Sequence, residues 1–264
     1  MLTNYEIGWD SVAEYSKSIM AIRYSLLPYF YTLMQAAHET GDTVLRAVSW
    51  EFPQDPTLFT VDTQFMVGSS LMVIPVLQQG ATSVSGYLPG ENVIWYDWYS
   101  QTAVPSSTQA QSFDAPMGHL PLFIRGGSIL PQQEPGLTTY KSRQGAWSLL
   151  VALDDAKTAA GDLYLDDGVS VENDQVQRVT FAAKAGSLTA TVSGSYDFAD
   201  YDVAPPPLDS IVILGLENFT STTVQLGGHT VDFSYDPSTH KLVVKNLSDI
   251  TKAGAWAQSW SLTW

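Results

Sequence analysis

The sequence contains no cysteine among its 264 residues. This absence excludes a disulfide-stapled fold and leaves the redox compartment undetermined. Long apolar runs are lacking too. The longest, Leu71 to Leu77, is interrupted by Pro75 and falls far short of the roughly 20 residues that span a bilayer. We therefore expect no membrane-spanning segment.

Basic residues are scarce. Twelve Lys and Arg stand against 27 Asp and Glu, which gives a formal net charge of -15. Such a surface repels phosphate backbones and anionic lipid, and this argues against binding to nucleic acid or to a membrane surface. A neutral substrate fits this charge better. The 45% hydrophobic content supports a folded globular chain.

The motifs of several enzyme classes are also missing. No G-x-S-x-G, P-loop or G-x-G-x-x-G occurs, so hydrolase-elbow, nucleotide and dinucleotide functions have no support. The histidines His38, His119, His229 and His240 are scattered, with no H-x-x-x-H pair to hold zinc. We therefore expect neither a metal nor a cofactor.

The first pattern along the chain is that of an amphipathic helix. Apolar residues recur at helical spacing from Val12 to Ala37, and Gly41 follows as a left-handed cap. Pro28 should kink this helix, because it has no backbone donor. The β-rich run from Thr43 to Trp50 then predicts one short strand, so the start of the chain looks like an incomplete α/β unit.

From Leu71 onward the pattern changes. Short β-rich runs recur at intervals of about ten residues, punctuated by Gly, Pro, Asp and Ser, which is typical of antiparallel sandwiches. Gly227-Gly228 separates two such runs and predicts a two-residue turn with positive φ. A change in composition near residues 144–146 indicates two β modules.

Two groups of residues are candidates for a catalytic or sugar-binding role. Glu51 and its neighbour Trp50 follow the predicted strand, and carboxylates at the ends of α/β barrel strands often carry chemistry. The alternative is a supporting or capping carboxylate. Asp97 lies among the aromatic residues of Trp95–Tyr99, a mixture that suits a sugar platform. Strand alternation favours instead a packed strand with one hydrogen-bonded aspartate.

An acidic run and two sequons complete the candidates. The run from Asp154 to Gly168 lacks the alternating spacing of a calcium loop, so turn chemistry explains its aspartates better than a metal. The sequons at Asn218 and Asn246 indicate a glycosylated, secreted protein, extracellular or associated with a cell wall.

Several segments of the sequence resemble glycoside hydrolase family 31 and occur in that family's order. They are Ile22–Leu33, Val44–Ala47, Trp50–Pro53, Asp62–Gly68, Pro121–Pro131 and Gly161–Gly168. The likeness covers roughly residues 9–172 and is greatest to fungal α-glucosidases. Beyond about Val176 the sequence resembles only a generic distal β domain.

The resemblance implies a retaining α-glucosidase that removes terminal α-linked glucose from neutral oligosaccharides, using two aspartates. The family's nucleophile lies in a Trp-Ile-Asp-Met-Asn-Glu-like segment and its acid in a His-Trp-x-Gly-Asp-like segment. Neither segment occurs in this sequence, and Asp97 matches a different family segment. We therefore assign no catalytic residue to this chain. Both aspartates are expected on an upstream polypeptide that carries the rest of the barrel, and the chain alone should be inactive.

The expected fold is mainly β. It comprises the end of a (β/α)8 barrel over residues 1–68, with a long helix and the last strand, a proximal β-sandwich over 69–145 and a distal one over 146–264. Trp50 and Glu51 would support the wall of a pocket that takes α-glucosides or malto-oligosaccharides in the assembled enzyme. Two alternatives stay open: a carbohydrate-binding protein that stacks sugars on Trp95, Trp98 and Tyr99, and a structural module without ligand.

Overall fold

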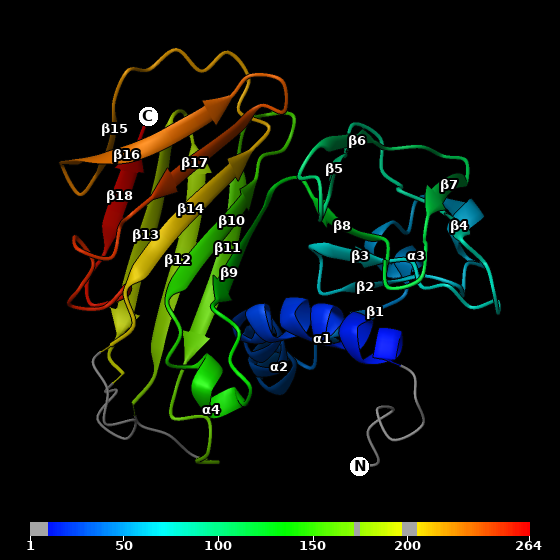
Figure 1. The fold of residues 1–264 in the computed structure, drawn as a ribbon, viewed down its shortest axis with the longest axis horizontal. Coiled ribbons are helices and arrows are strands. Elements are labelled where there is room, and N and C mark those ends of the chain that lie inside the picture. Colours follow the sequence, from blue (N-terminus) through cyan, green and yellow to red (C-terminus); the bar gives the residue numbers. More distant parts are fainter. Residues whose placement is uncertain (1–9, 172–174, 197–204) are drawn as a thin grey trace.

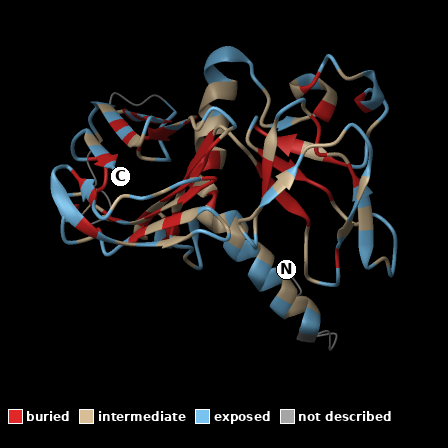
Figure 2. Cartoon of the chain, turned by 90° about the horizontal axis from the view of Figure 1, so that it is seen from above, coloured by how far each residue is buried: buried red, intermediate tan, exposed pale blue. Residues whose placement is uncertain are grey.

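The structure is a computed structural model that describes residues 10–171, 175–196 and 205–264. This part of the chain is mainly β, as predicted, with two strand systems and a pair of helices beside them (Figure 1). Buried residues concentrate within the strand systems, whereas the side chains described for the first helix are exposed or half-exposed (Figure 2). Within the described ranges, no helix combines the length and apolar character needed to cross a bilayer.

Two helices open the described chain, α1 (Asp10–Ser25) and α2 (Leu27–Thr40). They separate at Leu26 because Pro28, in the first turn of α2, has no N–H to donate to the preceding turn. Gly41 ends α2 with a φ of 76°, and its N–H donates to the Ala37 carbonyl at 2.9 Å. The predicted helical stripe, its interruption and its glycine cap are confirmed.

An antiparallel sheet follows the helices. In spatial order its strands are β1 (Leu45–Arg46), β2 (Phe65–Val67), β3 (Leu71–Val73), β8 (Leu122–Arg125), β5 (Ile94–Asp97) and β6 (Ala103–Pro105). One face packs against the short helix α3 (Val48–Glu51), the 3-10 turn η2 (Pro56–Leu58) and a ribbon of β4 (Ser83–Gly86) and β7 (Gln111–Asp114). The other face packs against α2, so the sheet is buried on both sides.

The structure corrects the predicted strand over Thr43–Trp50. Only β1 is extended there, and it pairs antiparallel with β2, whereas the strands of an α/β barrel run parallel. Glu51 forms an ion pair with Arg46 at 2.6 Å, although five fully extended residues would separate their Cα atoms by about 17 Å. This contact requires a folded segment, and Trp50 and Glu51 accordingly lie on α3 and not at the end of a barrel strand.

The second strand system is a closed, barrel-like sheet where the sequence predicted a distal sandwich. Around the ring its strands are β10 (Trp147–Ala152), β14 (Leu208–Leu214), β17 (Lys241–Lys245), β16 (His229–Asp236), β15 (Val224–Leu226), β18 (Trp260–Thr263), β13 (Ser187–Gly194), β12 (Gln177–Lys184), β11 (Ala159–Leu165) and β9 (Ser128–Gln133). The ring closes because β18 pairs with both β13 and β15, and β9 joins β10 to β11. Closure removes exposed sheet edges.

Strand β9 precedes the predicted domain boundary at residue 145 but belongs to the closed sheet. It pairs with β10 along its whole length and meets β11 where Ser128 lies beside Ala160. Gly161 permits this junction, since a Cβ at this position would lie only 2.3 Å from the Ile129 carbonyl oxygen. The hydrogen-bonded unit of the closed sheet therefore begins at Ser128.

The predicted hairpin at Gly227-Gly228 is confirmed. The two glycines have φ values of 56° and 85° and connect β15 to β16, with Leu226 paired to His229. Positive φ at both positions is what a two-residue turn of this kind needs, and glycine meets it without a Cβ clash.

The two strand systems share a buried core. Tyr96 of β5 donates its hydroxyl proton to the Leu153 carbonyl, just after β10, at 2.7 Å. Around this bond, Tyr29 of α2 and Ile124 of β8 pack in one cluster with Leu150 of β10. Helix, sheet and closed sheet therefore support one another through a common apolar layer.

Candidate functional site

Glu51, the carboxylate that the sequence places nearest to a pocket, is held between two arginines. Its two oxygens accept hydrogen bonds from Arg46 of β1 at 2.6 Å and from Arg125 of β8 at 3.1 Å. Arg46 also pairs with Asp42 at 2.5 Å, and the Arg125 guanidinium lies 4.6 Å from the centre of the Phe52 ring. This arrangement ties α3 to two strands and commits the carboxylate to structural contacts.

The surroundings of Arg46 favour the charged state of its guanidinium group. Burial lowers the pKa of Arg46, but the hydrogen bond from Arg46 to Glu51 and the charges of Glu51 and Asp42 outweigh that effect, and the net shift is upward. The raised pKa keeps the Arg46 guanidinium charged at physiological pH. Because both oxygens of Glu51 are bound by arginines, its carboxylate can hold α3 in position more readily than it can transfer a proton to a substrate.

Glu51→Gln should lower the free energy of unfolding by about 2 kcal/mol, because two largely buried guanidinium groups would then face a neutral amide. Urea unfolding measures the change. The matched control is Glu91→Gln at an exposed glutamate, which should leave stability within about 0.5 kcal/mol of the parent chain. Equal stability of the two variants would show that the cluster contributes nothing.

Trp50 points elsewhere. Its side chain is 63% exposed although it adjoins the largely buried Glu51. The structure therefore brings the two predicted pocket residues onto one short helix, with Glu51 largely buried and Trp50 exposed. A large exposed aromatic side chain is available to contact another surface.

The aromatic strand does not form the open platform of the carbohydrate-binding alternative. Trp95 is fully buried, and its indole N–H donates to the Pro89 carbonyl at 3.0 Å. Trp98 is half-buried, and Tyr99 donates its hydroxyl proton to the Leu120 carbonyl at 3.0 Å. Asp97 accepts hydrogen bonds from the backbone N–H groups of Tyr99 and Ser100. The interpretation as a packed strand with one hydrogen-bonded aspartate is confirmed.

The acidic run serves turns, as its spacing indicated. Asp154 accepts hydrogen bonds from the backbone N–H and the hydroxyl of Thr158 at 2.7 and 2.8 Å. Asp167 accepts the backbone N–H groups of Val169 and Ser170, both at 2.9 Å. In the described ranges, no group of three or more His, Cys, Asp or Glu residues could hold a metal ion.

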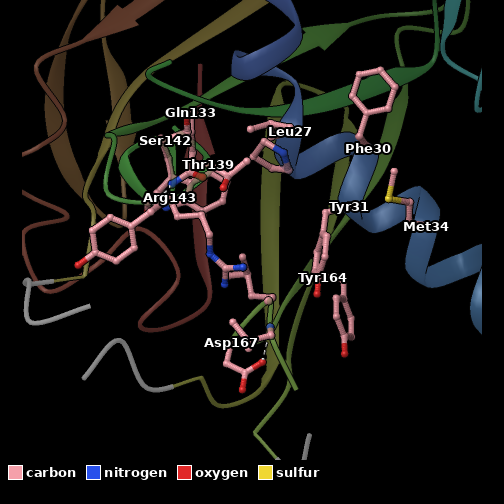
Figure 3. Close-up of a pocket in the computed structure, with 16 residues that line it drawn as sticks. Leu27, Phe30, Tyr31, Met34, Gln133, Thr139, Ser142, Arg143, Tyr164 and Asp167 are labelled. Carbon is pink, nitrogen blue, oxygen red and sulfur yellow. Dashed lines mark hydrogen bonds between the residues drawn. The ribbon is translucent and has the colours of Figure 1, made fainter. Parts of the chain in front are cut away.

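A large cavity that the sequence did not predict lies in the described part of the chain. A cavity of about 650 Å³ lies between α2, the short helix α4 (Thr139–Ser142) and the end of β11 (Figure 3). Tyr31 of α2 and Tyr164 of β11 stand beside each other in its wall, with ring centres 6.0 Å apart. Most of the lining is apolar or aromatic, including Leu27, Met34 and Trp147.

A polar contact joins α2 to the segment after β11 in the cavity wall. The Tyr31 hydroxyl donates to the carboxylate of Asp166 at 2.7 Å, and Asp166 also accepts the backbone N–H of Gly168 at 2.8 Å. Burial is the largest cause of the raised pKa of Tyr31, followed by the hydrogen bond and the charge of Asp166. The phenol is therefore neutral at physiological pH and acts as a fixed donor between α2 and the loop after β11.

A signal for this cavity existed in the sequence but was ambiguous. Leu27, Tyr31 and Met34 follow the spacing i, i+4, i+7 on one side of α2. The apolar stripe through Leu26 and Leu33 runs beside it, and that stripe alone suffices to predict an amphipathic helix. The face with Leu27, Tyr31 and Met34 indicates a cavity only once the structure shows that these residues line one.

Both sequon asparagines are exposed. Asn218 lies in the connection after β14 and Asn246 follows β17, each with positive φ. The Asn246 amide donates to Asp232 at 3.3 Å, a long and exposed contact. The geometry places both side chains where a glycan could project into solvent.

Comparison with known proteins adds sequence relatives. A family model described as the glycosyl hydrolase family 31 C-terminal domain matches residues 41–130. Over 262 residues the chain is 46% identical to an α-glucosidase of Aspergillus niger, an alignment that covers 97% of this chain and 26% of that protein. An α-glucosidase of Schizosaccharomyces pombe is 47% identical over 257 residues, with the same two shares. The chain thus spans about a quarter of the length of the curated relatives it matches.

Solved structures share the fold. A crystal structure of a glucosidase II alpha subunit in its alpha3-Glc2-bound form is 23% identical, with a TM-score of 0.85, over all of this chain and 30% of that one. A Flavobacterium johnsoniae dextranase complexed with glucose is also 23% identical, with a TM-score of 0.74, over 95% of this chain and 32% of that one. At these identities the likeness concerns architecture alone.

Proposed function

Because this chain belongs to glycoside hydrolase family 31 and corresponds to the C-terminal portion of its fungal α-glucosidases, we propose that it completes a retaining α-glucosidase. The whole enzyme would remove terminal α-linked glucose from oligosaccharides. The observation that carries this proposal is the 46% identity across 97% of the chain. Identity of this extent covers the helices, the first sheet and the closed sheet together.

We assign both catalytic aspartates to the upstream polypeptide. Retaining glycosidases hold two carboxyl groups about 5 to 5.5 Å apart at the scissile bond. The acids that looked catalytic in this chain have other tasks, since Glu51 pairs with two arginines and Asp97 caps a turn. These contacts support a scaffolding role for the chain.

In the assembled enzyme, α1 and α2 would be the last helix of the (β/α)8 barrel, whose strands would lie on the upstream polypeptide. The six-stranded sheet and the closed sheet that begins at Ser128 would brace it from outside. Trp50 and Glu51 would support the pocket wall, with Trp50 exposed toward the partner and Glu51 fixing α3 in place. Antiparallel pairing of β1 with β2 means that no barrel strand is proposed for this chain.

The substrate would be a malto-oligosaccharide or another neutral α-glucoside, which suits the net charge of -15.

We also propose that the enzyme is secreted and carries glycans on Asn218 and Asn246, both of which are exposed. The intact mass of the secreted protein should fall on enzymatic deglycosylation. Unchanged mass would remove the support for this localisation.

The purified chain alone should release no glucose from maltose, because it lacks the carboxyl pair on which the reaction depends. Glucose release measured by a coupled assay tests this, with a boiled sample as the background. Turnover that co-purifies with the chain through successive columns and scales with its concentration would contradict the proposal.

A further inference from the structure

We propose that the cavity between α2, α4 and β11 is a docking groove for an apolar segment of the upstream polypeptide. The inference rests on the proposed function, which supplies that partner, and it adds the place of contact. The candidate catalytic and pocket residues Trp50, Glu51 and Asp97 do not line this cavity. The groove therefore defines a second role for the chain, apart from the wall around Trp50.

The walls of the groove are built to receive apolar side chains. Leu27, Tyr31 and Met34 form one side of α2, and Trp147 and Tyr164 contribute aromatic surface from the closed sheet. The volume of about 650 Å³ lies within the range of clefts that bind ligands. A wide apolar cleft of this kind resembles the anchor pockets at the centre of protein interfaces.

Exposed apolar side chains surround the opening. Val169 is 88% exposed and Met34 is 56% exposed, and both line the groove. Tyr140 of α4 lines it as well and is also exposed, while the exposed Leu137 shortly precedes α4. They come from three segments of the chain that are distant in sequence. Convergence of such side chains around one cavity marks an interaction surface more strongly than the same residues scattered singly would.

The polar groups of the groove argue against a sugar as its occupant. Tyr31 donates to Asp166, and the Gln133 amide donates to the carbonyls of Arg143 and Gly145, each at 3.2 Å. Both oxygens of Asp167 accept hydrogen bonds from its own loop. A sugar site needs convergent polar groups that are available to the ligand. Here these polar groups already serve the chain itself, and apolar surface is what remains for a partner.

An upstream polypeptide would explain why the apolar groove is open in this chain. The chain covers only 26% of its Aspergillus niger relative, so about three quarters of such an enzyme would lie outside it. Helices α1 and α2 are the described elements nearest in sequence to that upstream portion. Helix α2, one of these two, contributes Leu27, Tyr31 and Met34 to the groove. We therefore assign the groove to that polypeptide and not to a second copy of this chain.

The test co-expresses the tagged chain with the upstream three quarters of the Aspergillus niger α-glucosidase and measures affinity by titration of the purified parts. Val169→Asp in the segment after β11 and Met34→Asp on α2 should each weaken binding by at least about tenfold, because a charge would be buried against apolar surface. The matched control is Leu77→Asp, at a residue that is 65% exposed and outside the groove, and it should bind as the parent does. Melting temperatures of the free variants verify that each one folds.

The outcomes separate the two proposals. Parental binding by both groove variants, in a complex that does form, would overturn the docking site while leaving the proposed function intact. Failure of the parent chain to bind at all would overturn both. Self-association of the parent chain that the groove variants abolish would assign the groove to a second copy. Maltotriose binding to the free chain that Val169→Asp abolishes would assign it to a sugar, and either result would refute the docking proposal.

Discussion

A chimera in which this chain replaces the corresponding quarter of the Aspergillus niger α-glucosidase is expected to hydrolyse maltose. The same enzyme without that quarter should lose at least about a hundredfold in kcat/KM, since a misplacement of about 1 Å in an active site can already cost that much. The physical reason is that this quarter supports the rest of the enzyme by packing against it. The 46% identity spans the helices and both strand systems, so the chain should supply the same packing surfaces.

The chimera carries its own control. Trp50→Ala within it should reduce kcat/KM if the exposed indole contributes to the pocket wall, whereas an alanine at the equally exposed Phe59 should have less effect. An inactive but folded chimera, with the secondary structure of the parent by circular dichroism, would show that the chain does not complete this enzyme.

Trp95→Ala should destabilise the chain by about 3 to 5 kcal/mol, the range for truncating a large buried aromatic residue. Trp95 is fully buried in one core cluster with Phe52 and Phe123, and its N–H donates to the Pro89 carbonyl, so the substitution leaves both a cavity and an unpaired acceptor. This loss is a large fraction of the stability of an ordinary domain. Thermal unfolding should show a melting temperature lower by about 10 °C.

Trp50→Ala is the matched control for this prediction. It removes the same side chain from a position that is 63% exposed, and stability should change by no more than about 0.5 kcal/mol. The comparison also addresses the carbohydrate-binding alternative. Unchanged stability of Trp95→Ala together with loss of binding to malto-oligosaccharides would favour a sugar platform and contradict the burial of this residue.

Local signals in the sequence predicted several elements well, because their causes are local. The break of the first helix follows from the missing N–H of Pro28, and its end follows from the positive φ that Gly41 tolerates. The hairpin at Gly227-Gly228 has the same kind of origin. Each of these features is determined within a few residues and needs no knowledge of the rest of the fold.

Elements that depend on distant partners were predicted less well. The run over Thr43–Trp50 has the composition of a strand, but its second half lies in α3, where Glu51 pairs with Arg46 and with the distant Arg125 of β8. Closure of the second sheet depends on β18, the last strand, pairing with β13 and β15. Pairings across such separations leave no local trace in the sequence.

The same distinction between local and distant causes applies to the candidate functional residues. Asp97 was interpreted correctly because alternation along one strand and a following turn decide its contacts. The groove escaped notice because its walls come from α2, α4 and β11, which meet only in the folded chain. The resemblance to family 31 showed that the family's two catalytic motifs do not occur in this sequence. A docking surface such as the one proposed here has no comparable motif.

The measurement that tests the central claim most directly is to map where the covalent intermediate forms. A fluorinated glucosyl fluoride traps the glycosyl-enzyme intermediate of a retaining glycosidase, and peptide mass spectrometry then identifies the carboxylate that carries the sugar. Applied to the active chimera, this labelling should mark an aspartate in the upstream, Aspergillus-derived part and no residue of this chain. A sugar found on an aspartate or glutamate of this chain would contradict the account.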